Sequence, residues 1–478
     1  MSVYLTKGVT YSTVIDLRTG NDGIYLSRDG WPRAVARRNE DGTWPKSVFE
    51  TMTISVDGTS HYDVASTIQT LDTTLREGTD HALEPLDENP VYLRTKLTNE
   101  STSYQTLVLS GGTEPATDYY SPPMDPGNYL SSHIIAIERT PFWEPESSTS
   151  VVLSSVVSTG DMARLYASGT SINGDVPARL EITRFRGVSG GGGPLTEFWI
   201  GFRTNRLADA TYDQTYFESV WLCQNGTASN NTTLNVADAT ALGGAKSRWT
   251  PAGGSDDNML TRVTIRASDL TATHAVAASV DPQAQRSRNL VLLRAKSTGT
   301  GTFRVRIQSG FYGGDNWKTG ARALVNSSSW YYYPMGTVDI PPLLYQPNWR
   351  TFIGQSAIRI QAELGAGTSS LDMDALIMIP QAEGAIYAKG GSVQYSSTGA
   401  VSYVEISSNA ADIRSGIAYD TTNSQYEAVQ IDPSNYALPN GPVVTVFAAQ
   451  RSSTQGLTDS ADIHLHYFTR WLNLRGSE

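Results

Sequence analysis

Several common features are scarce in this chain of 478 residues, and each scarcity excludes a class of protein. Its one cysteine, Cys223, has no partner for a disulfide within the chain, which excludes a disulfide-stapled extracellular fold and allows assembly in a reducing cytosol. No run of about 18 apolar residues occurs, and no basic patch precedes an apolar core near the N-terminus, so we expect neither a membrane span nor a standard export signal. Charged residues make up 17% of the chain, and its net charge is −11. Because clustered Lys and Arg supply most of the affinity for phosphate backbones, we expect no specific recognition of nucleic acid.

The short motifs of common enzyme families are also missing. The sequence has no nucleophile elbow, P-loop, HExxH zinc motif, dinucleotide-binding glycine motif or CxxC pair. Cys223 ends the apolar stretch SVWLC, a setting that favours a small buried hydrophobic residue over a nucleophile. Asp462, His464 and His466 are spaced to share one strand face, but no further converging ligand for a metal is identifiable. We therefore expect no enzyme activity, no cofactor and no bound metal.

One further pair of acidic residues leaves two interpretations open. In SLDMDALIMIP, Asp372 and Asp374 share one face of an expected strand, while Leu371, Met373 and Ala375 share the other. The pair is either a metal or acid–base site, or two carboxylates that fix loops at the edge of a sandwich.

The sequence does contain two similar segments far apart in the chain, HIIAIERTPFWEPE at 133–146 and DIHLHYFTRWLNLRG at 462–476. In both, apolar residues alternate with smaller or polar ones before an aromatic residue, which predicts a strand. The likeness predicts that the residues between them form an inserted module, after which the chain returns to its first domain. The expected anchors of this closure are Arg139, Trp143, Arg470 and Trp471.

The chain contains 42 glycines and 22 prolines, which separate short apolar stretches, a pattern typical of a mainly β protein. We divide it into blocks at 1–148, 149–385 and 386–478. The first block is expected to be an α+β domain, with alternating strands and one amphipathic helix over about 60–77. Val64, Ile68, Leu71 and Leu75 recur there at helical spacing, Ser60 with Asp63 forms a capping-box start, and Gly78 predicts the end of the helix.

The second block, 149–385, contains many strand-like stretches separated by turn-rich loops and almost no helical period. This pattern is typical of a large jelly-roll β-sandwich. The third block, 386–478, is short for an independent domain and is expected to pack back on the first.

A segment in the first block is expected to protrude. Between Trp31-Pro32 and Trp44-Pro45, proline follows tryptophan at both ends of a run that contains the turn signal Asp41-Gly42. The segment is either an assembly arm that reaches a neighbouring molecule or a solvated surface hairpin. The candidate arm residues are Trp31, Arg33, Arg37, Arg38 and Trp44.

The stretch 310–336 concentrates aromatic residues among Gly, Asn and Ser. Aromatic faces stack on sugar rings and nearby polar groups hydrogen-bond sugar hydroxyls, so the stretch is a candidate glycan site. The alternative is aromatic packing in the core, because alternate residues of a strand point in opposite directions. The candidate glycan-binding residues are Tyr312, Asp315, Trp317, Trp330 and Tyr332.

These segments together resemble a known family. The capped helix, followed by VYLRTKLTNESTSYQTLVLSGG and IIAIERTPFWEPE, resembles the ring-forming domain of distal tail proteins and related minor tail proteins of long-tailed phages. TSINGDVPARLEITRF and SLDMDALIMIP resemble the jelly-roll module joined to such domains, and LHYFTRWLNLRG is similar to the terminal strand of that group. In TSINGDVPARLEITRF, the residues that match the family pattern are Ile172, Gly174, Asp175, Pro177 and Ala178.

The resemblance implies a structural virion protein of the phage tail, a distal tail or baseplate-hub component assembled in the host cytoplasm. Its copies would form a closed ring, typically a hexamer, that joins the tail tube to the tip or baseplate proteins, and its sandwich would project toward host-surface glycans. The insertion is larger than a minimal ring protein needs, which leaves open an adjacent accessory role. Two rival classes remain: a carbohydrate-binding adhesin, which needs no ring, and a glycan-active enzyme, which needs two carboxylates about 5 to 10 Å apart in one cleft.

Overall fold

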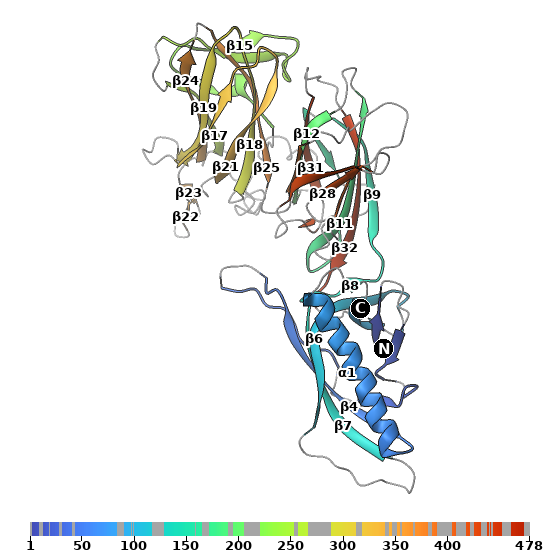
Figure 1. Cartoon of the computed structure of the whole chain (residues 1–478). Helices are drawn as coiled ribbons and strands as arrows, with labels where there is room; N and C mark the ends of the chain where they lie inside the picture. The colour runs from blue at the N-terminus through green and yellow to red at the C-terminus, as the bar shows by residue number, and fades with distance from the viewer. Residues whose placement is uncertain are drawn as a thin grey trace.

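The fold was obtained as a computed structural model of the chain. It describes residues 2–8, 13–18, 20–27, 31–40, 44–83, 90–96, 98, 100–116, 129–157, 159–164, 172–189, 195–204, 220–252, 257–265, 288–311, 318–339, 344–346, 351–353, 356–366, 369–380, 385–389, 404–407, 417–420, 425–431, 437–438, 440, 443–451 and 460–472. These residues form three domains, with the first at one end, the second next to it and the third beside the second (Figure 1). The mainly β fold predicted from the sequence is confirmed, and α1 is the single α-helix in the described part of the chain.

The first domain is an antiparallel sheet with one helix across one face (Figure 1). The strand order is β2-β1-β5-β6-β7-β4-β3, and β8 pairs with β6. The elements are β1 (Ser2–Lys7), β2 (Thr13–Asp16), β3 (Ile24–Leu26), β4 (Val48–Gly58), α1 (His61–Leu83), β5 (Val91–Lys96), β6 (Ser103–Pro115), β7 (Tyr129–Arg139) and β8 (Glu144–Pro145).

The helix packs on the sheet because each has an apolar face, produced by the spacing of apolar residues typical of its own secondary structure. On β4, Met52 and Ile54 are fully buried, whereas Thr51 and Thr53 are exposed, which is the period of two of a half-covered sheet. On α1, Leu71 and Leu75 recur at helical spacing and pack in the same cluster. Each such side chain contributes about 1.5–3 kcal/mol when it leaves water.

The helix begins where the sequence predicts and ends later. Ser60 caps the helix, because its Oγ accepts a hydrogen bond from the backbone N–H of Asp63 at 3.2 Å. Gly78 does not end it, since the helix continues to Leu83. A Cβ at Gly78 would lie 3.2 Å from Val91 Cβ and 3.3 Å from Val108 Cγ1. The glycine therefore serves the close approach of α1 to β5 and β6.

The second domain is an 11-stranded sheet built from two separate stretches of sequence. Its order is β10-β31-β12-β26-β29-β28-β27-β11-β32-β9, with β30 paired to β11. Because β9 and β10, at the two ends of this order, contact each other, the sheet curls into a nearly closed barrel. Its strands are β9 (Thr149–Val157), β10 (Thr159–Arg164), β11 (Val176–Ser189), β12 (Leu195–Thr204), β26 (Ala385–Lys389), β27 (Val404–Ser407), β28 (Ile417–Asp420), β29 (Gln425–Ile431), β30 (Ala437–Leu438), β31 (Val443–Arg451) and β32 (Ser460–Arg470).

The third domain lies within the second in sequence and is a two-layer β-sandwich. One sheet has the order β15-β16-β25-β18-β21 with β13 paired to β25, and the other has the order β14-β17-β24-β19-β20. Buried residues of both sheets, among them Trp249, Phe303, Ile360 and Leu376, form one core. The strands are β13 (Val220–Leu222), β14 (Thr227–Ala228), β15 (Thr232–Ala237), β16 (Ala245–Trp249), β17 (Asp257–Ile265), β18 (Arg288–Ser297), β19 (Thr302–Phe311), β20 (Lys318–Val325), β21 (Tyr331–Asp339), β24 (Ser356–Ala366) and β25 (Leu371–Pro380). A short 3-10 turn, η1 (Cys223–Asn225), follows β13, and β22 (Leu344–Gln346) pairs with β23 (Thr351–Ile353).

This division differs from the blocks expected at 149–385 and 386–478. Strands on both sides of 385 form the second domain, so the last block does not pack on the first domain as a separate sheet. The reason lies in β32, which pairs along its length with β9 and β11. Strand alternation predicts β32 as a strand but carries no information about which sheet it joins. Among the described residues, no helix has the length and apolar character to cross a membrane.

Candidate functional site

The junction of the first two domains is closed by a pair of tryptophans. The backbone N–H of Trp143 donates to the carbonyl oxygen of Trp471, and the N–H of Trp471 donates to that of Trp143, both at 3.0 Å. Two of the expected anchors thus meet, although they follow strands of different sheets, β7 and β32. At the end of β32, the carbonyl oxygen of Arg470 also accepts a hydrogen bond from the backbone N–H of Asp175 at 2.9 Å.

Gly174 lies beside this junction and has a conformation that side chains rarely adopt. Its φ is +146°, and a Cβ there would lie 2.8 Å from the Arg470 carbonyl oxygen. The backbone therefore approaches the end of β32 more closely than any other residue would allow.

A carboxylate between two arginines ties the same strands together. Glu144 on β8 accepts hydrogen bonds from Arg179 on β11, at 2.9 Å for Nε and 2.6 Å for Nη2. It also accepts one from Arg470 Nε, at the end of β32, at 3.0 Å. Burial by itself raises the pKa of Glu144, but the two guanidinium groups outweigh it and hold the pKa below its usual value. The ion pairs thus join the first domain to two strands of the second.

The base of the predicted arm is fixed by a buried ion pair. Arg139 on β7 and Glu50 on β4 are 0% and 3% exposed, and Arg139 Nη2 lies 3.0 Å from Glu50 Oε2. Glu50 Oε1 accepts the backbone N–H of Arg33 at 2.6 Å, and Arg139 Nη2 donates to the carbonyl of Ala34 at 2.7 Å. The guanidinium carbon of Arg139 also lies 4.7 Å from the ring centroid of Trp143. One ion pair therefore connects the arm, the sheet and the junction.

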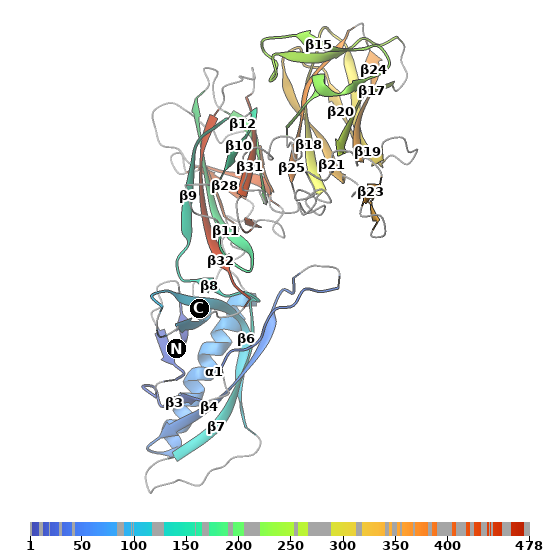
Figure 2. The ribbon, with the colours of Figure 1, turned by 180° about the vertical axis from the view of Figure 1, so that it is seen from behind.

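Both legs of the arm pack at the junction. Ala36 and Trp44 belong to a small apolar cluster with Phe142 and Val176 of the junction. The rings of Trp44 and Phe142 meet edge to face at 5.4 Å, and the guanidinium of Arg38 lies 5.0 Å from the Trp44 ring. The arm projects beyond the end of the sheet, between β3 and β4 (Figures 1 and 2).

The remaining arm candidates lie on different sides of the segment. Trp31 is partly buried against the core of the first domain, where the guanidinium of Arg18 lies 4.9 Å from its ring. Arg33 and Arg37 are exposed.

The third domain rests on the second through one apolar patch. Trp199 on β12 meets Tyr332 on β21 at a ring distance of 6.3 Å, and both belong to a cluster with Leu292, Ile377 and Ala448. Tyr332 is 1% exposed, so its ring belongs to this contact between domains. Its burial excludes the stacking on a sugar that the sequence predicts for it.

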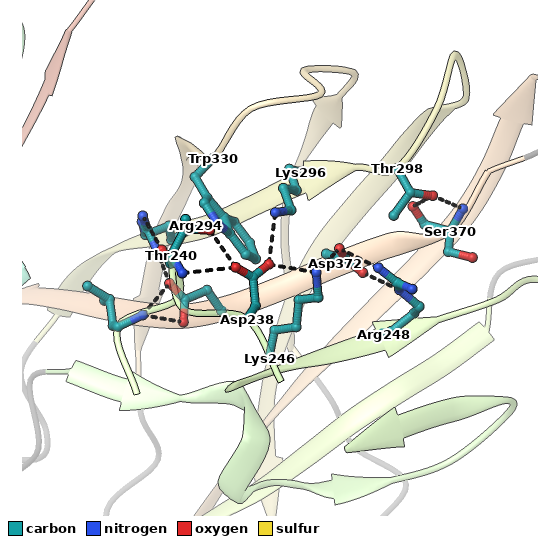
Figure 3. A network of polar contacts seen from close by, with 12 residues as sticks. Asp238, Thr240, Lys246, Arg248, Arg294, Lys296, Thr298, Trp330, Ser370 and Asp372 are labelled. Carbon is teal, nitrogen blue, oxygen red and sulfur yellow. Dashed lines mark hydrogen bonds and ion pairs between the residues drawn. The ribbon is translucent and has the colours of Figure 1, made fainter. Parts of the chain in front are cut away.

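The same sheet face becomes charged beyond this patch (Figure 3). Across β16, β25 and β18, Arg248, Asp372 and Lys296 stand side by side in register. Asp372 is fully buried and pairs with Arg248 Nε at 2.7 Å and with Lys246 Nζ at 2.7 Å. Lys246 and Lys296 in turn reach Asp238 Oδ2, at 2.7 and 2.9 Å.

Asp374 holds the loop that crosses this face. Its two carboxylate oxygens each accept the backbone N–H of Leu242 at 3.1 Å, and Arg294 pairs with Oδ2. Arg294 Nη2 donates to the Thr240 carbonyl at 3.2 Å. Of the two interpretations of the Asp pair, these contacts favour carboxylates that fix a loop, because each already faces a cation.

Trp330 lies under this loop among cations (Figure 3). It is 6% exposed, and its Nε1 donates to Thr240 Oγ1 at 2.9 Å. Lys296 Nζ lies 4.2 Å and the Arg294 guanidinium 5.0 Å from its ring centroid. The ring is thus buried and packed against the protein's own cations, which corrects the prediction that Trp330 stacks on a glycan. Tyr312, Asp315 and Trp317 lie outside the described residues.

In the part of the chain that the structure describes, no cluster of three or more His, Cys, Asp or Glu is arranged to hold a metal ion. Asp462 and His464 lie on β32, where their backbone partners in register on β11 are Arg186 and Arg184. Cys223 is fully buried in the sandwich core, as its apolar surroundings predict.

Glu50 and Arg294 are buried charged residues of the candidate site that sequence reasoning missed. Glu50 stands at an inward position of β4, and Arg294 interrupts the apolar run NLVLLRA on β18. A lone charge at an inward position of a strand is the available signal, because burial requires a partner. The partner itself, on another strand, leaves no mark in the local sequence.

No protein-family model matches the chain, and no curated protein sequence matches it either. Among solved structures, the chain is similar to the structure of infectious bursal disease virus Gx strain, with 9% identity, a TM-score of 0.17 and coverage of 68% of this chain and 79% of that chain. The Gt strain gives 9% identity and a TM-score of 0.17 over 79% of this chain and 84% of that one. The T=1 particles derived from this virus give 11% identity and a TM-score of 0.17 over 67% and 78%. Likeness at this level carries no inference about function.

Proposed function

We propose that this chain is a structural protein of a virus particle, a component of the tail of a long-tailed phage whose first domain assembles with other copies into a closed ring. The ring joins the tail tube to the tip or baseplate, and the second and third domains project from it. The sequence resemblance over the first domain, 172–178 and the last strand supports this function, together with the architecture that those segments adopt.

The observation that carries the proposal is the pairing of Trp143 with Trp471. The chain leaves the first domain after β8, the strand that directly follows Trp143, and comes back to it at Trp471, so the second and third domains form one insertion with both ends at the same place. Such an insertion is displayed by the first domain without interrupting its sheet. This leaves the sheet edges and the arm available for contacts between copies.

The partners in this proposal are other copies of the chain, tail-tube proteins and tip or baseplate proteins, with no cofactor. Glycan binding by the third domain is a second part of the proposal. It rests on Tyr312, Asp315 and Trp317, since Trp330 and Tyr332 are buried.

The rival proposals of an adhesin or a glycan-active enzyme have less support from the described residues. Asp372 and Asp374 are both buried and paired with cations, and Asp374 also holds the loop at Leu242. Carboxylates in this arrangement stabilise a fold, whereas a glycosidase needs two that face an open cleft. We therefore propose a protein without catalytic activity.

Native mass spectrometry of the purified full-length chain tests the proposal. Closed rings give one dominant species at a whole multiple of the 51.8 kDa chain, with little of the intermediate sizes. A chain that stays at 51.8 kDa at every concentration, alone and with tail-tube and tip proteins, contradicts the proposal.

A further inference from the structure

We infer that the outward side of the arm, together with Phe49 at its root, is the surface through which one copy of the chain binds a second copy. We call this surface the arm face; it consists of Arg33, Val35, Arg37 and Phe49. The inference rests on the proposed function and names a contact that a ring requires.

The arm turns alternate residues toward and away from the molecule. Ala36 is 3% exposed and packs at the domain junction, whereas Val35 beside it is 42% exposed. Arg33 and Arg37 are exposed on the same alternation as Val35. Val35, which stands between Arg33 and Arg37 in the sequence, therefore presents an apolar side chain to solvent. Arginine flanking an apolar anchor is a composition typical of protein contacts.

Phe49 adds a large apolar side chain at the root of the arm. It is 77% exposed because it lies on the face of β4 opposite Glu50 and α1, where its cross-strand neighbour on β7 is Glu138. Figure 2 shows no described element over this end of β4 on its outer side. An aromatic ring left this open costs solubility in a monomer and becomes an anchor when a partner covers it.

The arm face is held in place before any partner arrives. One leg is tied by Arg33 N–H and the Ala34 carbonyl to the buried pair of Glu50 and Arg139, at 2.6 and 2.7 Å. The other leg is tied by Trp44, which packs on Phe142 at 5.4 Å and carries Arg38 above its ring. Since the surface is already ordered, binding does not have to supply the entropy of ordering it.

Charge favours a second copy as the occupant. Residues 31–47 contain four basic side chains, Arg33, Arg37, Arg38 and Lys46, and two acidic ones, Glu40 and Asp41, so their net charge is 4 − 2 = +2. The whole chain has a net charge of −11, so the rest of the chain carries −11 − 2 = −13. A basic arm on an acidic protein is complementary to the body of another copy. The contact joins two different surfaces, which is the kind that builds rings.

The test compares Phe49→Ser and Arg37→Glu with a matched control, Tyr62→Ser. Tyr62 is also an open aromatic residue, 80% exposed, but lies at the start of α1, at the opposite end of β4 from the arm. All are surface changes, so unfolding curves serve to establish that each variant folds as the wild type does. Assembly of the full-length chain is followed by sedimentation against protein and salt concentration.

We expect Phe49→Ser to raise the concentration needed for assembly at least about tenfold, as removal of an anchor residue does. We expect Arg37→Glu to raise this concentration as well, and to make it depend less on the salt concentration. Tyr62→Ser assembles as the wild type does.

Other outcomes overturn the inference in distinguishable ways. If the wild type assembles and both arm variants assemble equally well, the ring stands and the arm face is not its contact. If the variants self-assemble normally but no longer bind tail-tube or tip proteins, the occupant is another protein. If the wild type never assembles, either alone or with tail-tube and tip proteins, the proposed function fails together with the inference.

Discussion

Trp143 and Trp471 each donate a backbone hydrogen bond to the other at 3.0 Å and so close the path of the chain through its second and third domains. The first strand of the second domain, β9, and the strand that precedes Trp471, β32, are hydrogen-bonded neighbours. The second domain is thus joined to the first by two chain segments side by side. Two paired connections restrict bending and twisting more than one linker would, so we expect the second domain to keep a defined direction relative to the first.

Replacing Trp471 by proline removes the N–H that donates to the Trp143 carbonyl. The carbonyl then loses a bond in a buried site, which costs about 1–3 kcal/mol. We expect faster hydrogen exchange at the Trp143 amide and a larger radius of gyration in solution scattering. The control is Trp471→Phe, which keeps the N–H and should behave as the wild type. Unchanged exchange at Trp143 in the proline variant shows that the tryptophan pair does not hold the domains.

Glu50→Gln leaves the buried guanidinium of Arg139 without its counter-charge. Loss of one partner of a buried ion pair costs about 3–5 kcal/mol, so we expect reduced protection from hydrogen exchange along β4 and β7. The double variant Glu50→Gln with Arg139→Met should recover part of the loss. As a control, Arg322→Met breaks an open pair with Glu363, 41% and 24% exposed, and should cost less than about 1 kcal/mol. Equal effects of the buried and open pairs contradict the role assigned to Glu50.

Tyr332→Ala removes the ring that meets Trp199 between the second and third domains. Deletion of a buried aromatic side chain costs about 3–5 kcal/mol, and here part of that loss falls on the contact between domains. We expect faster hydrogen exchange on β12 and β31 and a broader range of domain orientations in solution scattering. Leu324→Ala, at a site 58% exposed, serves as the control and should change stability by no more than about 0.5 kcal/mol. If β12 and β31 exchange as in the wild type, the patch is not what joins the domains.

The charged face of the third domain gives its stability a dependence on pH. Burial raises the pKa of Asp238, but hydrogen bonds from Lys246, Thr240 and Lys296 outweigh this and hold it well below its ordinary value of 3.8. A carboxyl whose pKa is depressed on folding adds stability above its unfolded pKa, and this contribution is lost as the pH falls below it. Asp238→Asn should therefore destabilise the third domain at neutral pH, and its difference from the wild type should shrink below the ordinary value of 3.8. A difference that does not change with pH, measured by urea unfolding, contradicts this role of the carboxylate.

The local sequence predicted the elements well because their signals are local. In the first domain, the alternation on β4 and the helical spacing of Leu71 and Leu75 are both confirmed. The end of the helix was predicted wrongly at Gly78, because a glycine that ends a helix and a glycine that permits close packing look the same in sequence.

The assignment of strands to sheets depends on contacts that the local sequence does not contain. β11 pairs with β32, so the second domain combines strands from both sides of the whole third domain. The partners of Glu50, Glu144 and Asp372 likewise lie on distant strands. Aromatic composition is ambiguous for the same reason. In sequence, Trp330 and Tyr332 look like sugar-binding residues, and only the groups packed on them, Lys296 and Trp199, distinguish them from such residues.

Electron microscopy of the negatively stained, purified full-length chain tests the central claim most directly, because it shows closed annuli or their absence particle by particle. The account predicts annuli of uniform diameter with the second and third domains projecting outward, formed by the chain alone or together with tail-tube and tip proteins. Solitary particles in both preparations contradict it.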